Sequence, residues 1–245
     1  MSPGPKRFRA ILFDAGQTLV DMRPDMVGFF AELLADCGHE FEPARLGVEL
    51  MEVARLDIER LVAGEAQGCP CSKQMLDDYW LGMNQRVFDR LGIGEAAHEL
   101  AHEIERRFNS GHYMYAYEDV AETLAELRAK GYRLGVVSNA TAGMANVLRV
   151  LGIERAVDFV IVSALAGHEK PGQPIFKMAI EQAGCAPSEI LFIGDHYICD
   201  YEASRKAGIT PLLINRAGRE QPADVKQVRN LEELMPLLEN GFFGS

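Results

Sequence analysis

Polar side chains follow three short apolar runs, at the points where buried strands are expected to end. The run Ile11–Phe13 is followed by Asp14, and two later runs end in Ser138 and Asp195. The other polar residues close to such ends are, in chain order, Thr18, Asn139, Lys170 and Asp200. A carboxylate at the end of a buried strand is costly unless a cation or a donor uses it. These positions therefore predict a functional site.

The residue types in this set suit phosphoryl transfer. Paired carboxylates bind Mg²⁺, which keeps several waters and bridges to phosphate oxygens. A carboxylate such as Asp14 can also attack phosphorus and form an aspartyl-phosphate. The ammonium group of Lys170 and the hydroxyl group of Ser138 can hold the phosphoryl oxygens and offset the charge that develops on them. The set predicts phosphoryl chemistry if the fold brings its members together.

The second half of the chain alternates short apolar strands with helices that end at glycine. After a first strand at 8–13, we expect strands at 133–137, 159–162, 190–193 and 211–214, and helices at 120–130, 141–151, 173–183, 199–207 and 231–238. This alternation is typical of βαβ units, in which a parallel sheet is buried on both faces. Right-handed crossovers then give a doubly wound, Rossmann-like α/β sheet, whose strand ends meet at one edge.

The section from residue 25 to residue 109 has helical periodicity and almost no strand signal. A break is expected at 64–72, and linkers are expected at 19–24 and 111–118. The section follows the carboxyl end of the first strand, which is the edge where open α/β sheets bind ligands. We therefore predict an α/β core domain of residues 1–21 and 117–245, and an inserted α-helical cap domain of residues 22–116.

In this order, the motifs resemble those of the haloacid dehalogenase superfamily. The matching letters are D-x-x-x-T beginning at Asp14, S-N at Ser138, K-P at Lys170 and G-D-x-x-x-x-D ending at Asp200. The helical insertion resembles the first type of cap domain in that superfamily. The resemblance covers almost the whole chain, and the ordered set is specific although each motif alone is short.

The resemblance implies a role for each matching position. Asp14 would be the nucleophile and a Mg²⁺ ligand, together with the backbone carbonyl of Gly16 and with Asp195, while Asp200 would support the metal site. The residues implied to hold or orient the phosphoryl group or the substrate are Gly16, Gln17, Thr18, Ser138, Asn139 and Lys170. The implied substrate is a small phosphorylated metabolite or another small anion.

Gly16 departs from the pattern of the superfamily's phosphatases, which have a second aspartate at this position. That aspartate protonates the leaving group and then deprotonates the attacking water. General acid–base catalysis typically contributes 10²–10⁴-fold, or about 3–5 kcal/mol of barrier. We therefore expect slow hydrolysis of alkyl phosphates and favour good leaving groups, such as those of acyl phosphates or anhydrides. The histidines that could replace the missing acid are His112, His168 and His196.

Other branches of the superfamily also lack the second aspartate. Haloacid dehalogenases displace halide, which needs no proton, phosphonoacetaldehyde hydrolases use a cap lysine, and phosphorylated ATPases release ADP. The letters GDHYICD from Gly194 resemble the Mg²⁺-binding form of the fourth motif, which argues against dehalogenation, and the predicted cap contains one lysine, Lys73. A non-catalytic binding or regulatory protein with this fold is the alternative from a different functional class.

Three further patterns have competing interpretations. HELAH, His98–His102, matches the zinc-binding H-E-x-x-H signature, but Phe108 stands where a metzincin has its third histidine. Cys69 and Cys71 form a C-x-C pair without a second pair, which favours a turn over a metal or redox site. The tyrosines that mark the return to the core either line the substrate cleft or pack at the hinge; they are Tyr113, Tyr115 and Tyr117.

Composition limits the partners and the compartment. The net charge of −11 argues against a protein that binds nucleic-acid backbones, because that function needs a basic face. No stretch approaches the roughly 18 apolar residues that span a bilayer, and we find no secretory signal pattern. The five cysteines, an odd number, fit a reducing compartment. We expect a cytoplasmic protein with no nucleic-acid or membrane partner, and the sequence does not indicate an oligomeric state.

Overall fold

The structure, a computed structural model, describes residues 7–67, 73–240 and 242–243, and its main feature is a six-stranded sheet. The strand order is β5-β4-β1-β6-β7-β8, and every neighbouring pair is parallel. The bounds are β1 (Ala10–Phe13), β4 (Arg133–Ser138), β5 (Phe159–Val162), β6 (Ile190–Gly194), β7 (Thr210–Ile214) and β8 (Gln227–Val228). The predicted doubly wound α/β fold is confirmed.

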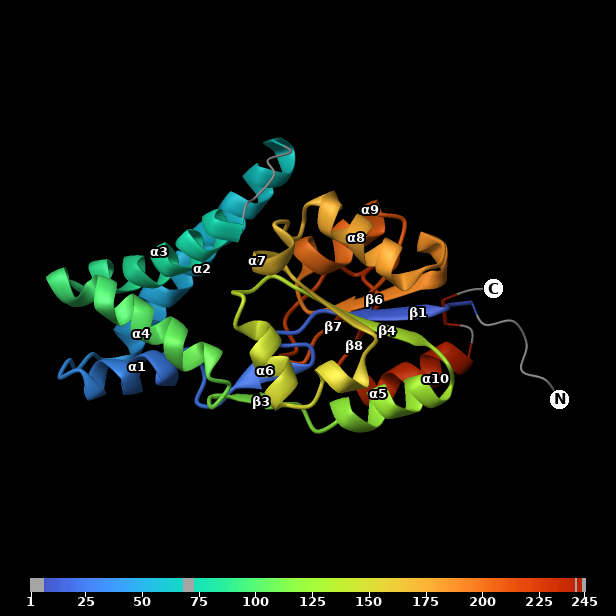
Figure 1. Ribbon diagram of the computed structural model, residues 1–245, viewed down its shortest axis with the longest axis horizontal. Helices are drawn as coiled ribbons and strands as arrows, with labels where there is room; N and C mark the ends of the chain where they lie inside the picture. The colour runs from blue at the N-terminus through green and yellow to red at the C-terminus, as the bar shows by residue number, and fades with distance from the viewer. Residues whose placement is uncertain (1–6, 68–72, 241, 244–245) are drawn as a thin grey trace.

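Helices cover both faces of this sheet, as Figure 1 shows. One face is covered by α5 (Val120–Ala129), α6 (Met144–Val150) and α10 (Leu234–Glu239), and the other by α7 (Ser163–Ala166), α8 (Gln173–Ala183) and α9 (Ala203–Lys206). Side chains alternate between the faces of a strand. Ile11 and Phe13 accordingly pack with the first set of helices, whereas Ala10 and Leu12 pack with the second. The central strand β1 is buried on both sides and ends at Asp14.

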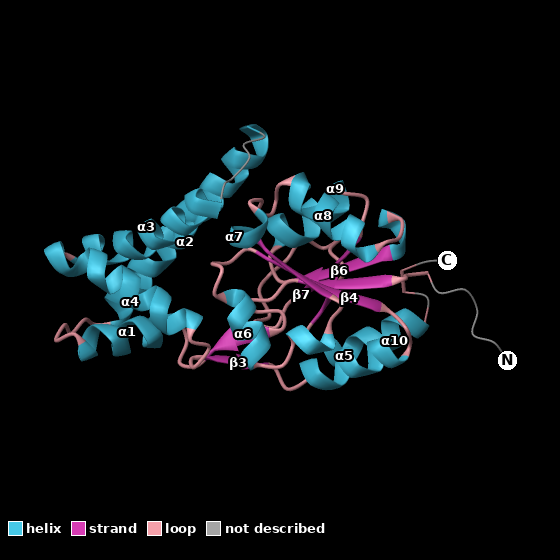
Figure 2. Ribbon diagram, viewed as in Figure 1, coloured by secondary structure: helices cyan, strands magenta, loops and turns pink. Residues whose placement is uncertain are grey.

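Four α-helices of the described chain lie between β1 and α5 in the sequence, and they are placed to one side of the sheet (Figure 2). These inserted helices are α1 (Met26–Asp36), α2 (Pro43–Gln67), α3 (Lys73–Leu91) and α4 (Ala97–Asn109). They have a hydrophobic core of their own, which includes Phe30, Leu33 and Phe88. The chain enters and leaves them through β2 (Val20–Met22) and β3 (Met114–Ala116), which pair antiparallel. The two predicted linkers therefore form a short ribbon; the exact division into domains stays a prediction.

The structure also corrects several predicted boundaries. The predicted break at 64–72 is wrong in its first part, because α2 continues through Gln67; the alanines and glutamate around Gly64 favour helix and offset the cost of about 1 kcal/mol for an interior glycine. The helix expected at 199–207 is a π-helix, Tyr197–Glu202, followed by α9. Short 3₁₀ turns occur at Gly94–Ala96, Glu154–Ala156, Pro187–Glu189 and Leu231–Glu233.

The lengths of the described helices and the state of the described cysteines bear on two of the predictions. Within the described residues, every helix is too short or too polar to cross a membrane. Cys69 and Cys71 lie outside the described residues, so the C-x-C interpretation is not addressed. Three cysteines of the described part are free thiols, namely Cys37, Cys185 and Cys199.

Candidate active site

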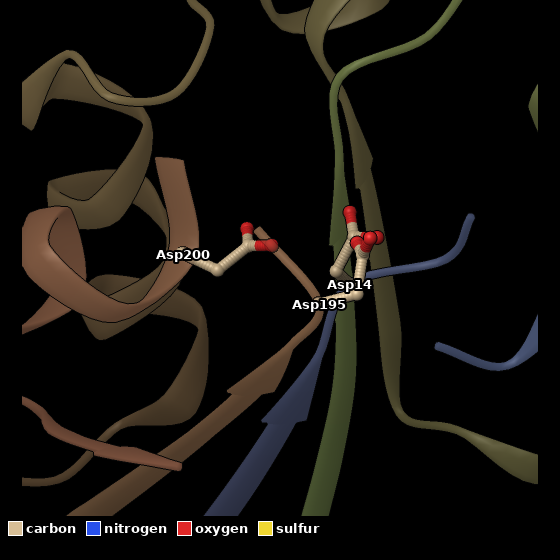
Figure 3. Close-up of side chains that lie close together, drawn as sticks. All are labelled: Asp14, Asp195 and Asp200. Atoms are coloured by element: carbon tan, nitrogen blue, oxygen red, sulfur yellow. The ribbon is translucent and has the colours of Figure 1, made fainter. Parts of the chain in front are cut away.

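Three carboxylates meet at the carboxyl edge of the sheet. Phe13 pairs with Ile193 of β6, and the N–H of Asp14 donates a hydrogen bond of 2.8 Å to the Ile193 carbonyl. Because Asp195 directly follows β6, this register places it beside Asp14. One carboxylate oxygen from each of Asp14, Asp195 and Asp200 lies within 4.8 Å of the others (Figure 3). The motifs quoted above therefore converge as the parallel sheet predicts.

Lys170 lies between two of these carboxylates. Its Nζ donates hydrogen bonds of 2.6 Å to Oδ1 of Asp14 and of 2.6 Å to Oδ1 of Asp200, and its side chain is 2% exposed. Burial acts to lower the pKa of Lys170, but the charges of the two aspartates outweigh burial and hold that pKa above its ordinary value. Lys170 therefore carries a positive charge in direct contact with the Asp14 carboxylate, where it can offset the charge of a bound anion.

The carboxylates themselves have raised pKa values. Burial raises the pKa of Asp14 to about 6, with Lys170 acting to lower it and Asp200 to raise it. Burial raises the pKa of Asp195 to about 8, and the neighbouring charges of Asp14 and Asp200 add to the effect. Within the described part of the chain, no donor forms a hydrogen bond to the Asp195 carboxylate. The charges of Lys170 and Arg219 act to lower the pKa of Asp195 but do not outweigh burial, so the three carboxylates hold an excess of negative charge.

This donor set fits a Mg²⁺ ion. Mg²⁺ prefers hard oxygen ligands and takes one or two carboxylates while keeping several waters. Asp195, half-buried and without a hydrogen-bond donor, is the carboxylate for which a cation would relieve most of the desolvation. Asp200 is already engaged, since its Oδ1 accepts from Lys170 and its Oδ2 accepts from the His196 N–H at 2.9 Å. Asp200 therefore supports the site by positioning its neighbours, while Asp14 and Asp195 supply the carboxylate oxygens that a cation could bind.

Asn139 holds the backbone of Lys170. Its Nδ2 donates to the Lys170 carbonyl at 2.6 Å, and its Oδ1 accepts from the Lys170 N–H at 2.8 Å. Ser138, the last residue of β4, is 2% exposed. It lines a cavity of about 390 Å³, which Asp14 also lines. Asn139 thus positions the backbone of Lys170, and Ser138 lies at the same end of the sheet as Asp14.

Gly194 has a role that the sequence analysis missed. A Cβ atom at this position would lie 2.4 Å from Cγ of Asp200, so only glycine lets the Asp200 side chain pack against the end of β6. The glycine is visible in the letters G-D of the fourth motif. Its close contact is not, because that contact is with Asp200, six residues later. Gly194 is therefore a steric requirement of the site.

The loop after Asp14 brings two of its three predicted residues to the cavity. Gly16 and Gln17 line it, and the Gln17 Oε1 accepts a hydrogen bond of 2.9 Å from Arg219. Thr18 is fully buried and lies outside the lining, and its Oγ1 has no hydrogen-bond partner among the described residues. The structure does not bring the Thr18 hydroxyl group to the cavity, and its phosphoryl-binding role stays a prediction.

None of the three histidines considered as a substitute acid lines the cavity. His112 is exposed at the start of the return to the sheet. Burial lowers the pKa of His196, and its Nδ1 accepts a hydrogen bond of 3.1 Å from the Cys199 N–H. His196 is therefore a neutral helix cap near neutral pH, which makes it a poor proton donor. His168 is half-buried, two residues before Lys170.

The other patterns have structural explanations. His98 and His102 are exposed on α4 with ring centroids 4.7 Å apart, and in the described part of the chain the aspartate triad is the one cluster of three possible metal ligands. The tyrosines pack at the β2–β3 ribbon, since Tyr113 contacts Phe29 and the Tyr117 hydroxyl group donates to Asp21 at 2.5 Å. Lys73 is the first residue of α3, and its side chain is not among those described.

A cavity of about 390 Å³ connects the sheet edge to the inserted helices. Asp14, Ser138 and Asn139 line one end, and residues of α1 to α4 line the other. The sequence analysis did not identify Trp80, Asn84 or Glu105, which all line this cavity. Their signal is indistinguishable from that of ordinary helical residues, because the sequence does not show which helix face points toward the sheet.

An ion pair joins the inserted helices to the loop that carries the lysine. Arg60 of α2 donates to both carboxylate oxygens of Glu169, at 2.6 and 2.9 Å, and Glu169 directly precedes Lys170. The guanidinium group of Arg60 also lies 3.8 Å from the ring centre of Tyr79 on α3, whose hydroxyl group donates to Asp57 at 2.6 Å. We refer to Asp57, Arg60, Tyr79 and Glu169 as the Arg60 bridge.

The sequence profile of haloacid dehalogenase-like hydrolases matches residues 11–214, a span that contains every motif of the site. The chain belongs to this family. Its sheet, its inserted helices and the aspartate triad are thus features of a family member.

Two of the similar proteins cover almost the whole chain, and a third covers about half of it. Haloacid dehalogenase-like hydrolase domain-containing protein 3 of Danio rerio is 27% identical over 230 residues, which are 92% of this chain and 93% of that protein. A glyceraldehyde 3-phosphate phosphatase of Methanothermobacter thermautotrophicus is 33% identical over 117 residues, or 47% of this chain and 52% of that protein. The solved structure of the HAD-hydrolase YfnB from Bacillus subtilis superposes with a TM-score of 0.77 at 19% identity, over 95% of this chain and 99% of that one. At that identity the likeness shows the fold.

Proposed function

We propose that the protein is a Mg²⁺-dependent phosphohydrolase that forms an aspartyl-phosphate at Asp14, and that its substrate is a small phosphorylated metabolite with a good leaving group. The observation that carries the proposal is the Asp14 carboxylate at the floor of a cavity, 2.6 Å from Lys170 and clustered with Asp195 and Asp200. The similarity of the chain to a glyceraldehyde 3-phosphate phosphatase supports phosphate as the group transferred.

The residues of the chain account for both chemical steps. Lys170 holds one oxygen of Asp14, and the other oxygen forms a bond to phosphorus. The bond between phosphorus and the leaving oxygen breaks, and the leaving group takes the electron pair. A carboxylate leaving group needs no proton, so the absence of an acid at Gly16 does not slow this step. Water then attacks the phosphorus of the aspartyl-phosphate, which frees Asp14 and inorganic phosphate, and the water proton passes to phosphate or solvent.

Asp14, Asp195 and the backbone carbonyl of Gly16 would hold the Mg²⁺ ion, with Asp200 in support. When bound, the ion supplies positive charge next to the phosphoryl oxygens. The Ser138 hydroxyl group and Lys170 bind the remaining phosphoryl oxygens. We further propose that the inserted helices act as a cap domain, which excludes bulk water from the cavity during the reaction. The cap would comprise residues 22–116 and the core residues 1–21 and 117–245.

Phosphate release from acetyl phosphate and 4-nitrophenyl phosphate, with and without Mg²⁺, tests the proposal. We expect turnover that requires Mg²⁺, disappears in Asp14→Asn, and survives in Asp89→Asn, a matched change at an exposed position on α3. Absence of turnover with both substrates would favour a non-catalytic binding protein. Metal-independent release of chloride from 2-chloropropionate would favour the dehalogenase alternative, and hydrolysis of phosphonoacetaldehyde would favour the phosphonatase alternative.

A further inference from the structure

The inserted helices give the cavity an apolar wall. Met26 of α1, Leu50 and Ala54 of α2, and Met83 and Val87 of α3 all line it. Methionine side chains adapt to irregular apolar shapes, and two of these five residues are methionine. The volume of about 390 Å³ lies within the range of ordinary small-molecule sites, roughly 300–1,000 Å³. The cavity is therefore large enough for a substrate body beyond the phosphoryl group.

The same wall offers few polar partners. In the described part of the chain, no lysine, arginine or histidine lines the cavity, whereas Asp21 and Glu105 do. A second phosphate or carboxylate on the substrate would thus meet acidic groups and no cation. A sugar would lose water from several hydroxyl groups against methionine, leucine and valine, and each unpaired buried hydroxyl group is costly.

Two polar side chains of α3, Trp80 and Asn84, also belong to this wall. The indole Nε1 of Trp80 is buried and has no hydrogen-bond partner among the described residues, and Asn84 lies one turn further along α3. Glu105 of α4 also lines the cavity, and burial raises the pKa of its carboxyl group. The cavity thus combines an anionic reaction centre with an apolar body and one or two polar contacts.

We propose that the substrate is a monophosphate whose leaving group carries an apolar chain or ring and no second charge. The inference rests on the proposed function and names its substrate class: acyl phosphates with an alkyl or aromatic body are the simplest members. The apolar wall, which includes Met83 and Ala54, selects the substrate, and the sheet edge performs the chemistry.

A series of acyl phosphates isolates the effect of the wall, since acetyl, butyryl and hexanoyl phosphate have leaving carboxylates of nearly equal basicity. Burial of one methylene is worth about 0.8 kcal/mol, which corresponds to about fourfold in kcat/KM. We expect kcat/KM to rise by about 10²-fold from acetyl to hexanoyl phosphate, which differ by four methylenes. Equal values across the series, with turnover present, would overturn the inference and leave the phosphohydrolase proposal intact.

A pair of variants tests the wall itself. Ala54→Phe adds a ring to a residue that lines the cavity, and we expect it to lower the ratio of hexanoyl to acetyl phosphate kcat/KM by at least tenfold. Met51→Phe places the same ring three residues earlier on α2, at a side chain that is 75% exposed and outside the lining, and should leave the ratio unchanged. An equal ratio in the two variants would contradict the assigned position of the alkyl chain.

Trp80 gives a readout that does not require turnover. It is the one tryptophan in the sequence and it lines the cavity, so its fluorescence reports on occupancy. We expect hexylphosphonate to change the emission with a Kd roughly 10²-fold or more below that of methylphosphonate, because five methylenes are added. Chain-length-dependent binding without turnover would support the apolar site and reject the phosphohydrolase. Binding that is independent of chain length, or tighter binding of a bisphosphonate, would reject the apolar substrate class.

Discussion

Restoring an aspartate at position 16 tests whether the missing acid limits the chemistry. A Cβ atom built on Gly16 has no heavy atom within 4 Å, and the backbone there is not in the left-handed region, so Gly16→Asp should fold without strain. The new carboxyl group would stand near three carboxylates and one ammonium group. Its pKa should rise for that reason, which suits a general acid.

The expected gain depends on the leaving group. An alkoxide needs a proton as it leaves, and general acid catalysis is typically worth 10²–10⁴-fold, or about 3–5 kcal/mol. A carboxylate needs none, so an acyl phosphate should gain only from activation of water in the second step. We therefore expect Gly16→Asp to raise the ratio of hexyl phosphate to hexanoyl phosphate kcat/KM by at least 10²-fold in saturating Mg²⁺.

Gly16→Asn is the matched control, because it has nearly the same shape and cannot transfer a proton in the same way. Phosphate release measured for both variants and both substrates gives the ratio directly. If Gly16→Asp and Gly16→Asn change the ratio equally, the reasoning that glycine removes a required acid is refuted. If neither variant changes it, proton transfer to the leaving group does not limit the reaction.

Three further predictions follow from contacts at the site. In Gly194→Ala the new methyl group would overlap Cγ of Asp200, so Mg²⁺ affinity and kcat/KM should each fall by at least tenfold, as titration calorimetry and phosphate release would show. Asn139→Ala removes two hydrogen bonds to the Lys170 backbone, each worth about 1 kcal/mol, and should lower the free energy of urea unfolding by about 1–3 kcal/mol. In metal-free protein between about pH 4 and pH 8, Asp195 is protonated in the native state but ionised in the unfolded state, so the free energy of unfolding should fall as the pH rises. Mg²⁺ should raise the free energy of unfolding more at pH 8 than at pH 5. Urea titrations of Asp195→Asn should show both pH trends flattened.

The sheet was predictable because its elements carry strong local signals. The strand Phe159–Val162 and the helix Gln173–Ala183 have the predicted bounds. A short apolar run defines the strand, and the glycine that follows the last residue defines the end of the helix. The ribbon of β2 and β3 was not predicted, because strands of three residues contain too few positions to show a period. The π-helix at Tyr197–Glu202 contains Asp200, whose carboxylate accepts a hydrogen bond from Lys170, and this tertiary contact has no signature in the local sequence.

The reaction centre was more predictable than the substrate end. Asp14, Lys170 and Asp195 converge because parallel strand ends must meet at one edge, so order along the chain was sufficient. The burial of Thr18 away from the cavity and the position of Glu105 within it depend on how loops and helices pack. Sequence periodicity identifies the apolar face of a helix but not the object that this face covers, which is why the apolar wall became visible only in three dimensions.

The Arg60 bridge gives the inserted helices a second attachment to the sheet, in addition to the covalent one at the β2–β3 ribbon. Any movement of α2 away from the loop that carries Lys170 would break the Arg60–Glu169 ion pair, and Glu169 is joined by one peptide bond to the lysine that contacts Asp14. A change in this ion pair would therefore act directly on the loop that carries the ammonium group. The ion pair of the Arg60 bridge is mostly shielded from solvent, so water competes little with it, and it ties α2 to the residue next to Lys170.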